Sequence, residues 1–133
     1  MSKTLRTLLS AGLVAVTSLS PMAAFADTSL GVYQTTDRKM DYNLTLCGSG
    51  GKDLCVKLTA IRGSADIPRT RAFLNKNIIS NATPAGKNTW KGKITMEGYT
   101  ADGTLKLNPG TNFVMHGCAY VVVCQDFTLI PAK

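Results

Sequence analysis

The sequence has little of the chemistry that enzymes usually display. Its 133 residues include one histidine, His116, and contain no G-x-S-x-G, H-E-x-x-H or P-loop motif. The eight acidic residues are scattered and fall mostly near expected turns, so no pair of carboxylates stands out as a general acid and base. We therefore predict no catalytic residue, no cofactor and no enzymatic activity. A proton transfer between His116 and a carboxylate that the fold brings close is the remaining enzymatic alternative.

Long hydrophobic runs are also missing. The most apolar segment, residues 8–19, is interrupted by hydroxyl side chains and is short for a bilayer span. Two basic residues precede it, a proline follows it, and Ala24-Phe25-Ala26 offers small residues at both positions that a signal peptidase reads. The pattern predicts a signal peptide over residues 1–26, cleaved after Ala26, with a retained membrane anchor as the weaker alternative. Residues 27–133 would then form one exported domain, periplasmic or secreted and not membrane-spanning.

Acidic residues are few, but the basic residues that outnumber them do not cluster. Two of the 15 basic residues lie in the signal segment, which leaves 13 against eight acidic residues and a net charge of +5 for the exported domain. No run of lysine and arginine forms a basic stripe, so nucleic acid is not an expected partner. A spread positive charge suits either a solvated surface or contact with an anionic component of the cell envelope.

The four cysteines lack the spacings of redox and haem motifs. No C-x-x-C or C-x-x-C-H occurs, so neither a thioredoxin-type couple nor covalent haem attachment is indicated. In a short exported chain an even number of cysteines predicts two disulfides. Cys47 and Cys55 flank a glycine-rich turn and share one side of the expected hairpin, where their Cα atoms can approach closely enough to bond. A zinc site built from the cysteines, with or without His116 replacing one of them, is the alternative.

Cys118 and Cys124 leave two pairings open. Joined by straight extended chain, their Cα atoms would lie roughly 20 Å apart, too far for a bond. Either the chain reverses between them or each cysteine pairs elsewhere. Residues 119–123 contain no glycine, proline, asparagine or aspartate to favour a turn.

What the sequence does contain is apolar residues that alternate with polar ones, the pattern of strands with one buried face. The clearest case begins at Trp90, with Ile94 and Met96 on the same face and lysine and threonine on the other. Turns are expected at Asp102-Gly103 and over residues 81–88. Strands are expected at residues 30–33, 42–46, 54–60, 78–79, 90–97, 104–107, 113–115, 119–123 and 127–130.

The number and spacing of these strands indicate the fold class. Residues 62–77 break the alternation and are expected to form a connection with one helical turn after Pro68. Eight or nine short strands with hairpin-length links predict an all-β fold, an antiparallel up-and-down barrel or a sandwich. An eight-stranded barrel can be filled by its own side chains or can hold a small ligand.

Several short motifs occur in a fixed order along residues 30–129. They are Gly31-Val32-Tyr33, Cys47-Gly48, Leu54-Cys55, Asn88-Thr89-Trp90-Lys91-Gly92, Asp102-Gly103-Thr104-Leu105 and Gly117-Cys118, followed by Cys124. In this order they resemble the small secreted bacterial proteins grouped as domain of unknown function 2147. The resemblance implies a single small antiparallel up-and-down β-barrel of lipocalin-like outline, exported to the envelope, with local disulfides Cys47–Cys55 and Cys118–Cys124. It implies no established activity.

The chain departs from that family in two respects. Tyr33 and Phe127 stand where tryptophan is common in the family. An acidic, asparagine-rich stretch expected before the central connection is reduced to Ser64-Ala65-Asp66. A site built from that stretch is therefore not expected here.

Two aromatic and two basic residues are the candidate ligand contacts. Trp90, the only tryptophan, and Tyr33 would line a pocket if the barrel holds one, and filling the core is the alternative. Arg69 and Arg71 could hold a carboxylate or phosphate at the barrel mouth, although two arginines on a loop can equally be solvated. We predict a periplasmic barrel that binds a small apolar or amphipathic ligand. The alternative is an envelope protein that recognises another protein or an anionic polymer through its surface, which a packed interior would favour.

Overall fold

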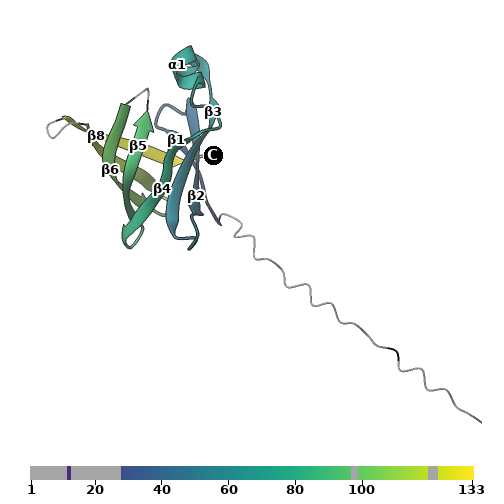
Figure 1. Cartoon of the computed structure of the whole chain (residues 1–133). Coiled ribbons are helices and arrows are strands. Elements are labelled where there is room, and N and C mark those ends of the chain that lie inside the picture. Colours follow the sequence, from purple (N-terminus) through teal and green to yellow (C-terminus); the bar gives the residue numbers. More distant parts are fainter. Residues whose placement is uncertain (1–11, 13–27, 97–98, 120–122) are drawn as a thin grey trace, which may run out of the picture.

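Eight strands close into a barrel (Figure 1). The computed structural model describes residues 12, 28–96, 99–119 and 123–133, so the predicted signal peptide, apart from Gly12, and its cleavage site lie outside the described residues. In chain order the elements are β1 (Thr28–Thr35), β2 (Met40–Cys47), β3 (Asp53–Ile61), the 3-10 turn η1 (Gly63–Ala65), α1 (Pro68–Arg71), β4 (Asn77–Gly86), β5 (Thr89–Met96), β6 (Tyr99–Asn108), β7 (Asn112–Ala119) and β8 (Val123–Pro131).

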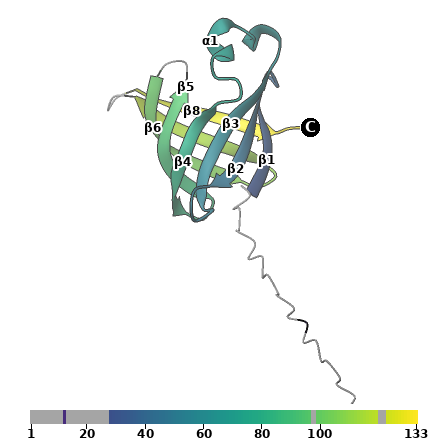
Figure 2. The ribbon, with the colours of Figure 1, turned by 45° about the vertical axis from the view of Figure 1, so that its right-hand side comes forward.

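The strands follow one another around the barrel in the order of the sequence. Each pairs in antiparallel fashion with its neighbour in the chain, and β8 returns to pair with β1. The predicted all-β, up-and-down barrel is therefore confirmed. The helical turn expected after Pro68 is α1, which lies with η1 in the connection from β3 to β4, above one end of the barrel (Figures 1 and 2). We call this end, where β1–β2, β5–β6 and β7–β8 are also joined, the upper end of the barrel.

Three sequence predictions about turns and strands are wrong. Asp102-Gly103 is not a turn but lies inside β6, and Met96 pairs with Tyr99 instead. Residues 81–88 are not a loop throughout, because β4 continues to Gly86. The strand expected over residues 119–123 is not one strand, because Ala119 ends β7, Val123 begins β8 and the two residues pair with each other; residues 120–122 lie outside the described residues. In each case pairing with the neighbouring strand outweighs the local preference of the residues.

The lower part of the barrel is filled by apolar side chains from the inward face of each strand. The ring centroids of Tyr33 and Phe113 lie 6.4 Å apart, and the Trp90 indole N–H donates to the carbonyl of Lys52 in the β2–β3 turn over 3.0 Å. Trp90 thereby ties β5 to the lower end of the barrel. The buried cluster comprises Tyr33, Tyr42, Leu44, Leu54, Val56, Leu58, Ile78, Ile79, Ala82, Trp90, Ile94, Leu105, Leu107, Phe113, Met115 and Leu129.

Both expected disulfides are present. Cys47–Cys55 joins β2 to β3 and is buried, with the side-chain oxygen of Asn81 lying 3.4 Å from the Cys47 sulfur. Cys118–Cys124 joins β7 to β8, so the chain does reverse between these two cysteines. The zinc alternative is not realised, since all four sulfurs are held in S–S bonds and no thiolate is left as a ligand.

Candidate functional site

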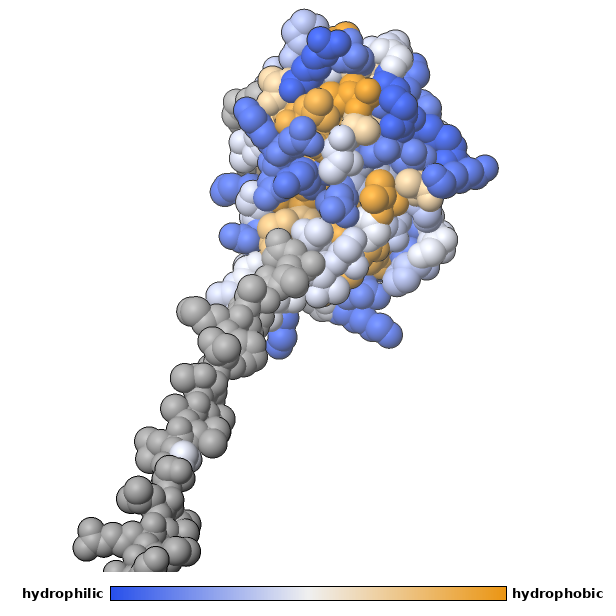
Figure 3. Space-filling view, turned by 90° about the vertical axis from the view of Figure 1, so that its right-hand side faces the viewer, coloured by the Kyte–Doolittle hydropathy of each residue, from blue (hydrophilic) through white to orange (hydrophobic). Residues whose placement is uncertain are grey.

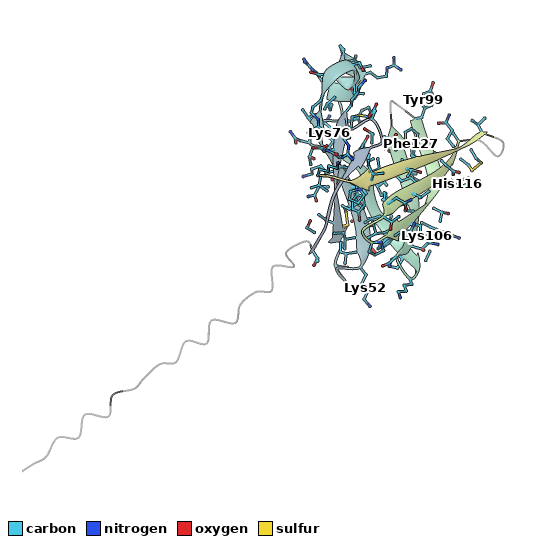
Figure 4. The ribbon with its side chains drawn as sticks, turned by 180° about the vertical axis from the view of Figure 1, so that it is seen from behind. Lys52, Lys76, Tyr99, Lys106, His116 and Phe127 are labelled. Carbon is cyan, nitrogen blue, oxygen red and sulfur yellow. A yellow bond between two sulfur atoms is a disulfide. The ribbon has the colours of Figure 1, made fainter. Side chains whose placement is uncertain are left out.

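An apolar pocket of about 470 Å³ lies toward the upper end of the barrel. Its volume falls within the range of small-molecule sites. Figure 4 shows Tyr99 at this end and Phe127 on β8, with Lys52 at the opposite end. The described residues that line it are Met40, Ile94, Tyr99, Ala101, Met115, Gly117, Ala119, Val123, Gln125 and Phe127.

The pocket opens where inward-facing residues of two neighbouring strands are small, below Tyr99 at the start of β6. Along β6 the inward positions read Leu107, Leu105, Gly103 and Ala101 from the lower end upward. Along β7 they read Phe113, Met115, Gly117 and Ala119. Side-chain volume therefore falls along two neighbouring strands, and the space that large residues fill below stays open above.

Ile94 forms the floor of this space together with Met115. Both are almost fully buried, at 6% and 2% exposure, and both line the pocket. The Ile94 side chain lies across two glycines, since a Cβ added to Gly103 would stand 2.5 Å from its Cδ1 and one added to Gly117 would stand 3.4 Å away. The glycines thus let Ile94 lie flat against the wall, which keeps the pocket above it open.

The lining of the pocket carries no charge. None of the described lining residues is Asp, Glu, Lys, Arg or His, and the polar side chains are Gln125 and, 71% exposed, Tyr99. An ionised group placed inside would lose its hydration without a counter-charge. The geometry therefore favours an apolar ligand, or an amphipathic one whose head is neutral or faces solvent.

One wall of the pocket is the hairpin of β7 and β8. β8 pairs with β1 over residues 129–131 only, whereas it pairs with β7 along residues 123–129. Within the described register, residues 123–128 therefore have a partner strand on the β7 side alone. Val123, Gln125 and Phe127 face the pocket from this stretch, and the Cys118–Cys124 bond ties its end to β7.

The four residues predicted to bind ligand do not line the pocket. Tyr33 and Trp90 are buried, at 5% and 6% exposure, in the packed lower part. Arg69 and Arg71 are exposed on α1, at the same end of the barrel as the pocket, and Arg71 donates to Asp66 over 2.9 Å. The arginines are thus at the expected end without being among the lining residues. Sequence reasoning missed the pocket because it looked for aromatic and charged side chains, whereas small residues on β6 and β7 leave the space open.

A hydrogen-bonded ion pair braces the upper end beside Met40. Arg62 donates to Asp41 over 3.0 Å and to the backbone carbonyl of Arg38 over 2.8 Å, and Gln34 donates to Asp41 over 2.9 Å. The bond from the guanidinium is the main cause that lowers the pKa of Asp41, partial burial opposes it, and the amide of Gln34 lowers the pKa further. The network ties the β1–β2 turn to the end of β3.

Replacing Asp41 with asparagine should lower the free energy of unfolding at neutral pH by about 1 kcal/mol or less, as a partly exposed ion pair is lost. Because the folded-state pKa of Asp41 is depressed, its contribution is present above the ordinary value of 3.8 and is lost as the pH falls through the folded value. Urea denaturation of both proteins at neutral and at acid pH tests this. Asp102→Asn is the control, since its pair with Lys93 is largely exposed. If Asp41→Asn lowered the free energy of unfolding by as much at acid pH as at neutral pH, the ion pair with Arg62 would not be the source of the stabilisation.

A polar groove of about 740 Å³ runs over the outer face of β4 to β7. Lys91, Lys93 and Thr104 line it, and His116 and Cys118 lie in it as well. One ligand atom from each of His116, Cys118 and Cys124 lies within 4.8 Å of the others, but the two sulfurs are bonded to each other.

No family model, curated protein or solved structure matches this chain at a significant level. The resemblance to domain of unknown function 2147 therefore stays a prediction. Among the described residues, no helix is long and apolar enough to cross a membrane.

Proposed function

We propose that this barrel binds a small apolar or amphipathic molecule in its upper pocket and catalyses no reaction on it. The observation that carries the proposal is the uncharged pocket of about 470 Å³ above the floor formed by Ile94 and Met115. Burial of apolar surface contributes roughly 25 cal/mol per Å² to the binding free energy. Because the described lining of the pocket holds no charged side chain, ligand binding does not have to remove water from an ion of the protein. Gln125 offers an amide to a neutral head group.

The proposal includes export to an oxidising compartment, the periplasm or the exterior. Two disulfides in a domain of this size support it, because such bonds persist where thiols are not kept reduced. The signal-like pattern that ends at Ala26 supports it from the sequence. An apolar molecule of the cell envelope, such as a fragment of a lipid, would be consistent with both the proposed compartment and the uncharged pocket.

Straight-chain alcohols and acids of increasing length should displace an environment-sensitive fluorophore from the protein saturably. Each added CH₂ should raise affinity about fourfold, the equivalent of about 0.8 kcal/mol, until the pocket is full. Because the described lining holds no cation, an alcohol should bind at least as tightly as the acid of equal length. The absence of saturable displacement across the series would reject the proposal. Trp90 fluorescence is a poor reporter here, since that residue lies below the pocket.

The alternative is recognition of a protein or an anionic polymer through the outer surface. The groove lined by Lys91, Lys93 and Asp102 carries one net positive charge, and this is the observation that favours an anionic partner. The face beside the C-terminus is mostly hydrophilic, with apolar residues in its upper part and in smaller patches lower down (Figure 3). Normal retention of an anionic polymer after Lys91→Gln and Lys93→Gln together would remove the groove from consideration.

A further inference from the structure

The two disulfides of this barrel differ sharply in their surroundings. Cys47 and Cys55 are 5% and 9% exposed and are covered by Asn81. Cys118 and Cys124 lie on the outer face, and Cys124 is exposed. Thiol–disulfide exchange requires that a thiolate reach a sulfur atom, so only the second bond is open to it in the folded protein.

A histidine lies against the exposed bond. His116 stands two residues before Cys118 on β7, so both side chains point to the same face, and His116 Nε2 lies 3.6 Å from Cys118 Sγ. The other ring nitrogen, Nδ1, is hydrogen-bonded to the carboxylate of Asp126, the residue paired with His116 on β8. An ionised carboxylate only accepts hydrogen bonds, so Nδ1 carries a hydrogen and Nε2 is left facing the sulfur.

The outer groove gives access to this cluster. His116 and Cys118 lie in the groove, and Lys91 and Lys93 line it as well. Figure 4 shows His116 on the outside of the barrel. Asp102 lines the groove too and pairs with Lys93, so the lining carries one net positive charge that a small anionic thiol such as glutathione would meet before it reached the sulfur atoms.

We propose that Cys118–Cys124 is a thiol–disulfide exchange site, assisted by His116 and positioned by Asp126, whose reductant is a small thiol or a protein dithiol. The incoming thiolate attacks the exposed Sγ of Cys124 and forms a mixed disulfide, while the Cys118–Cys124 bond breaks and its electron pair leaves on Cys118 Sγ. Protonated His116 stabilises that thiolate through Nε2–H and can donate the proton to it. A second thiol then attacks the mixed disulfide, so that the protein disulfide and two thiols become two cysteine thiols and one oxidised reductant.

The arrangement serves the reverse reaction too. With His116 neutral, Nε2 accepts the proton of the Cys118 thiol, and the thiolate so formed can attack a mixed disulfide on Cys124 and restore the bond. This site differs from a C-x-x-C couple, because its two cysteines lie opposite each other on neighbouring strands. It is a separate feature from the ligand pocket and does not depend on it.

Partial reduction of the folded protein tests the proposal, with Cys47–Cys55 as the control inside the same molecule. The protein is incubated with reduced glutathione and a chelator, quenched with an alkylating reagent at intervals, and mapped by peptide mass. Cys118–Cys124 should open at least about tenfold faster than Cys47–Cys55. His116→Gln should slow the first reaction by about threefold to tenfold and leave the second unchanged, as the leaving thiolate loses its proton donor.

Three further variants separate assistance by His116 from general effects. Lys93→Gln removes a positive charge from the same groove without touching sulfur, and it should slow the reaction less than His116→Gln does. Asp126→Ala should slow it, and Asp126→Asn should restore most of the rate because its amide oxygen still accepts from Nδ1–H. General loosening of the fold would speed the opening of both disulfides. Equal rates for the two bonds, or a His116→Gln variant as fast as the native protein, would overturn the proposal.

Discussion

Replacing Ala101 with phenylalanine should reduce ligand affinity by about a hundredfold. Ala101 lines the pocket on β6 one inward position above Gly103, where a phenyl ring would occupy the space of the ligand. If the ring excludes about four CH₂ groups, the loss is about 3 kcal/mol, which is about a hundredfold in the dissociation constant. Displacement of the bound fluorophore by a long-chain alcohol measures it directly.

The adjacent residue provides the matched control. Thr100 precedes Ala101 on β6 and is exposed on the outer face, so Thr100→Phe adds the same ring outside the barrel. It should leave ligand affinity unchanged. The urea midpoint of Ala101→Phe should stay close to that of the native protein, because the ring enters open space and not a packed core. Equal affinities for the two variants would show that the ligand binds elsewhere.

The fold could be predicted because the chain repeats one signal many times. Alternation at Leu44 and Leu46 in β2, at Leu54, Val56 and Leu58 in β3, and from Trp90 in β5 indicates strands with one buried face. Short links between such strands favour an up-and-down arrangement, and closure into a barrel removes the open edges. The local disulfide Cys47–Cys55 follows from the same register.

Strand ends were harder to predict because local turn preference competes with pairing across the sheet. Asp102-Gly103 has the composition of a turn, yet Gly103 serves a different purpose: its missing side chain makes room for Ile94. Residues 119–123 have the composition of a strand, yet Ala119 ends β7 and pairs with Val123 at the start of β8, and Cys118 is bonded to Cys124 across the two strands. In both places the deciding contact comes from another strand, which the local sequence does not contain.

The sequence contains a signal for the pocket, but this signal is a gradual change in residue size along two strands and not a short motif. The inward positions of β6 change from leucine to glycine and alanine toward the upper end, and those of β7 run in parallel from Phe113 to Ala119. A decrease in the volume of inward-facing side chains along two strands predicts a cavity in a barrel. This prediction requires knowing that the two strands are neighbours and which of their ends lie together. Tyr33 and Trp90, chosen for their aromatic rings, instead fill the packed part.

Two phenylalanine-to-alanine substitutions should separate the packed part of the barrel from its pocket. Phe113 is fully buried against Tyr33, so Phe113→Ala should lower the free energy of unfolding by about 3–5 kcal/mol, a large share of the 5–15 kcal/mol typical of a domain. Phe127 lines the pocket and is 38% exposed, so Phe127→Ala should cost about 1 kcal/mol or less. Urea denaturation under non-reducing conditions, with both disulfides intact, compares the two.

The effects of the two substitutions on ligand affinity should be in the opposite order, with Phe127→Ala the more damaging. Phe127→Ala removes apolar surface that the ligand would cover and should weaken long-chain alcohols by about tenfold, the equivalent of about 1.4 kcal/mol. Phe113→Ala, measured at low temperature where it stays folded, should bind almost as the native protein does, because Met115 and Ile94 still form the floor. If Phe127→Ala were as destabilising as Phe113→Ala and left affinity unchanged, the β7–β8 wall would be part of the core, and the ligand site would have to be sought elsewhere.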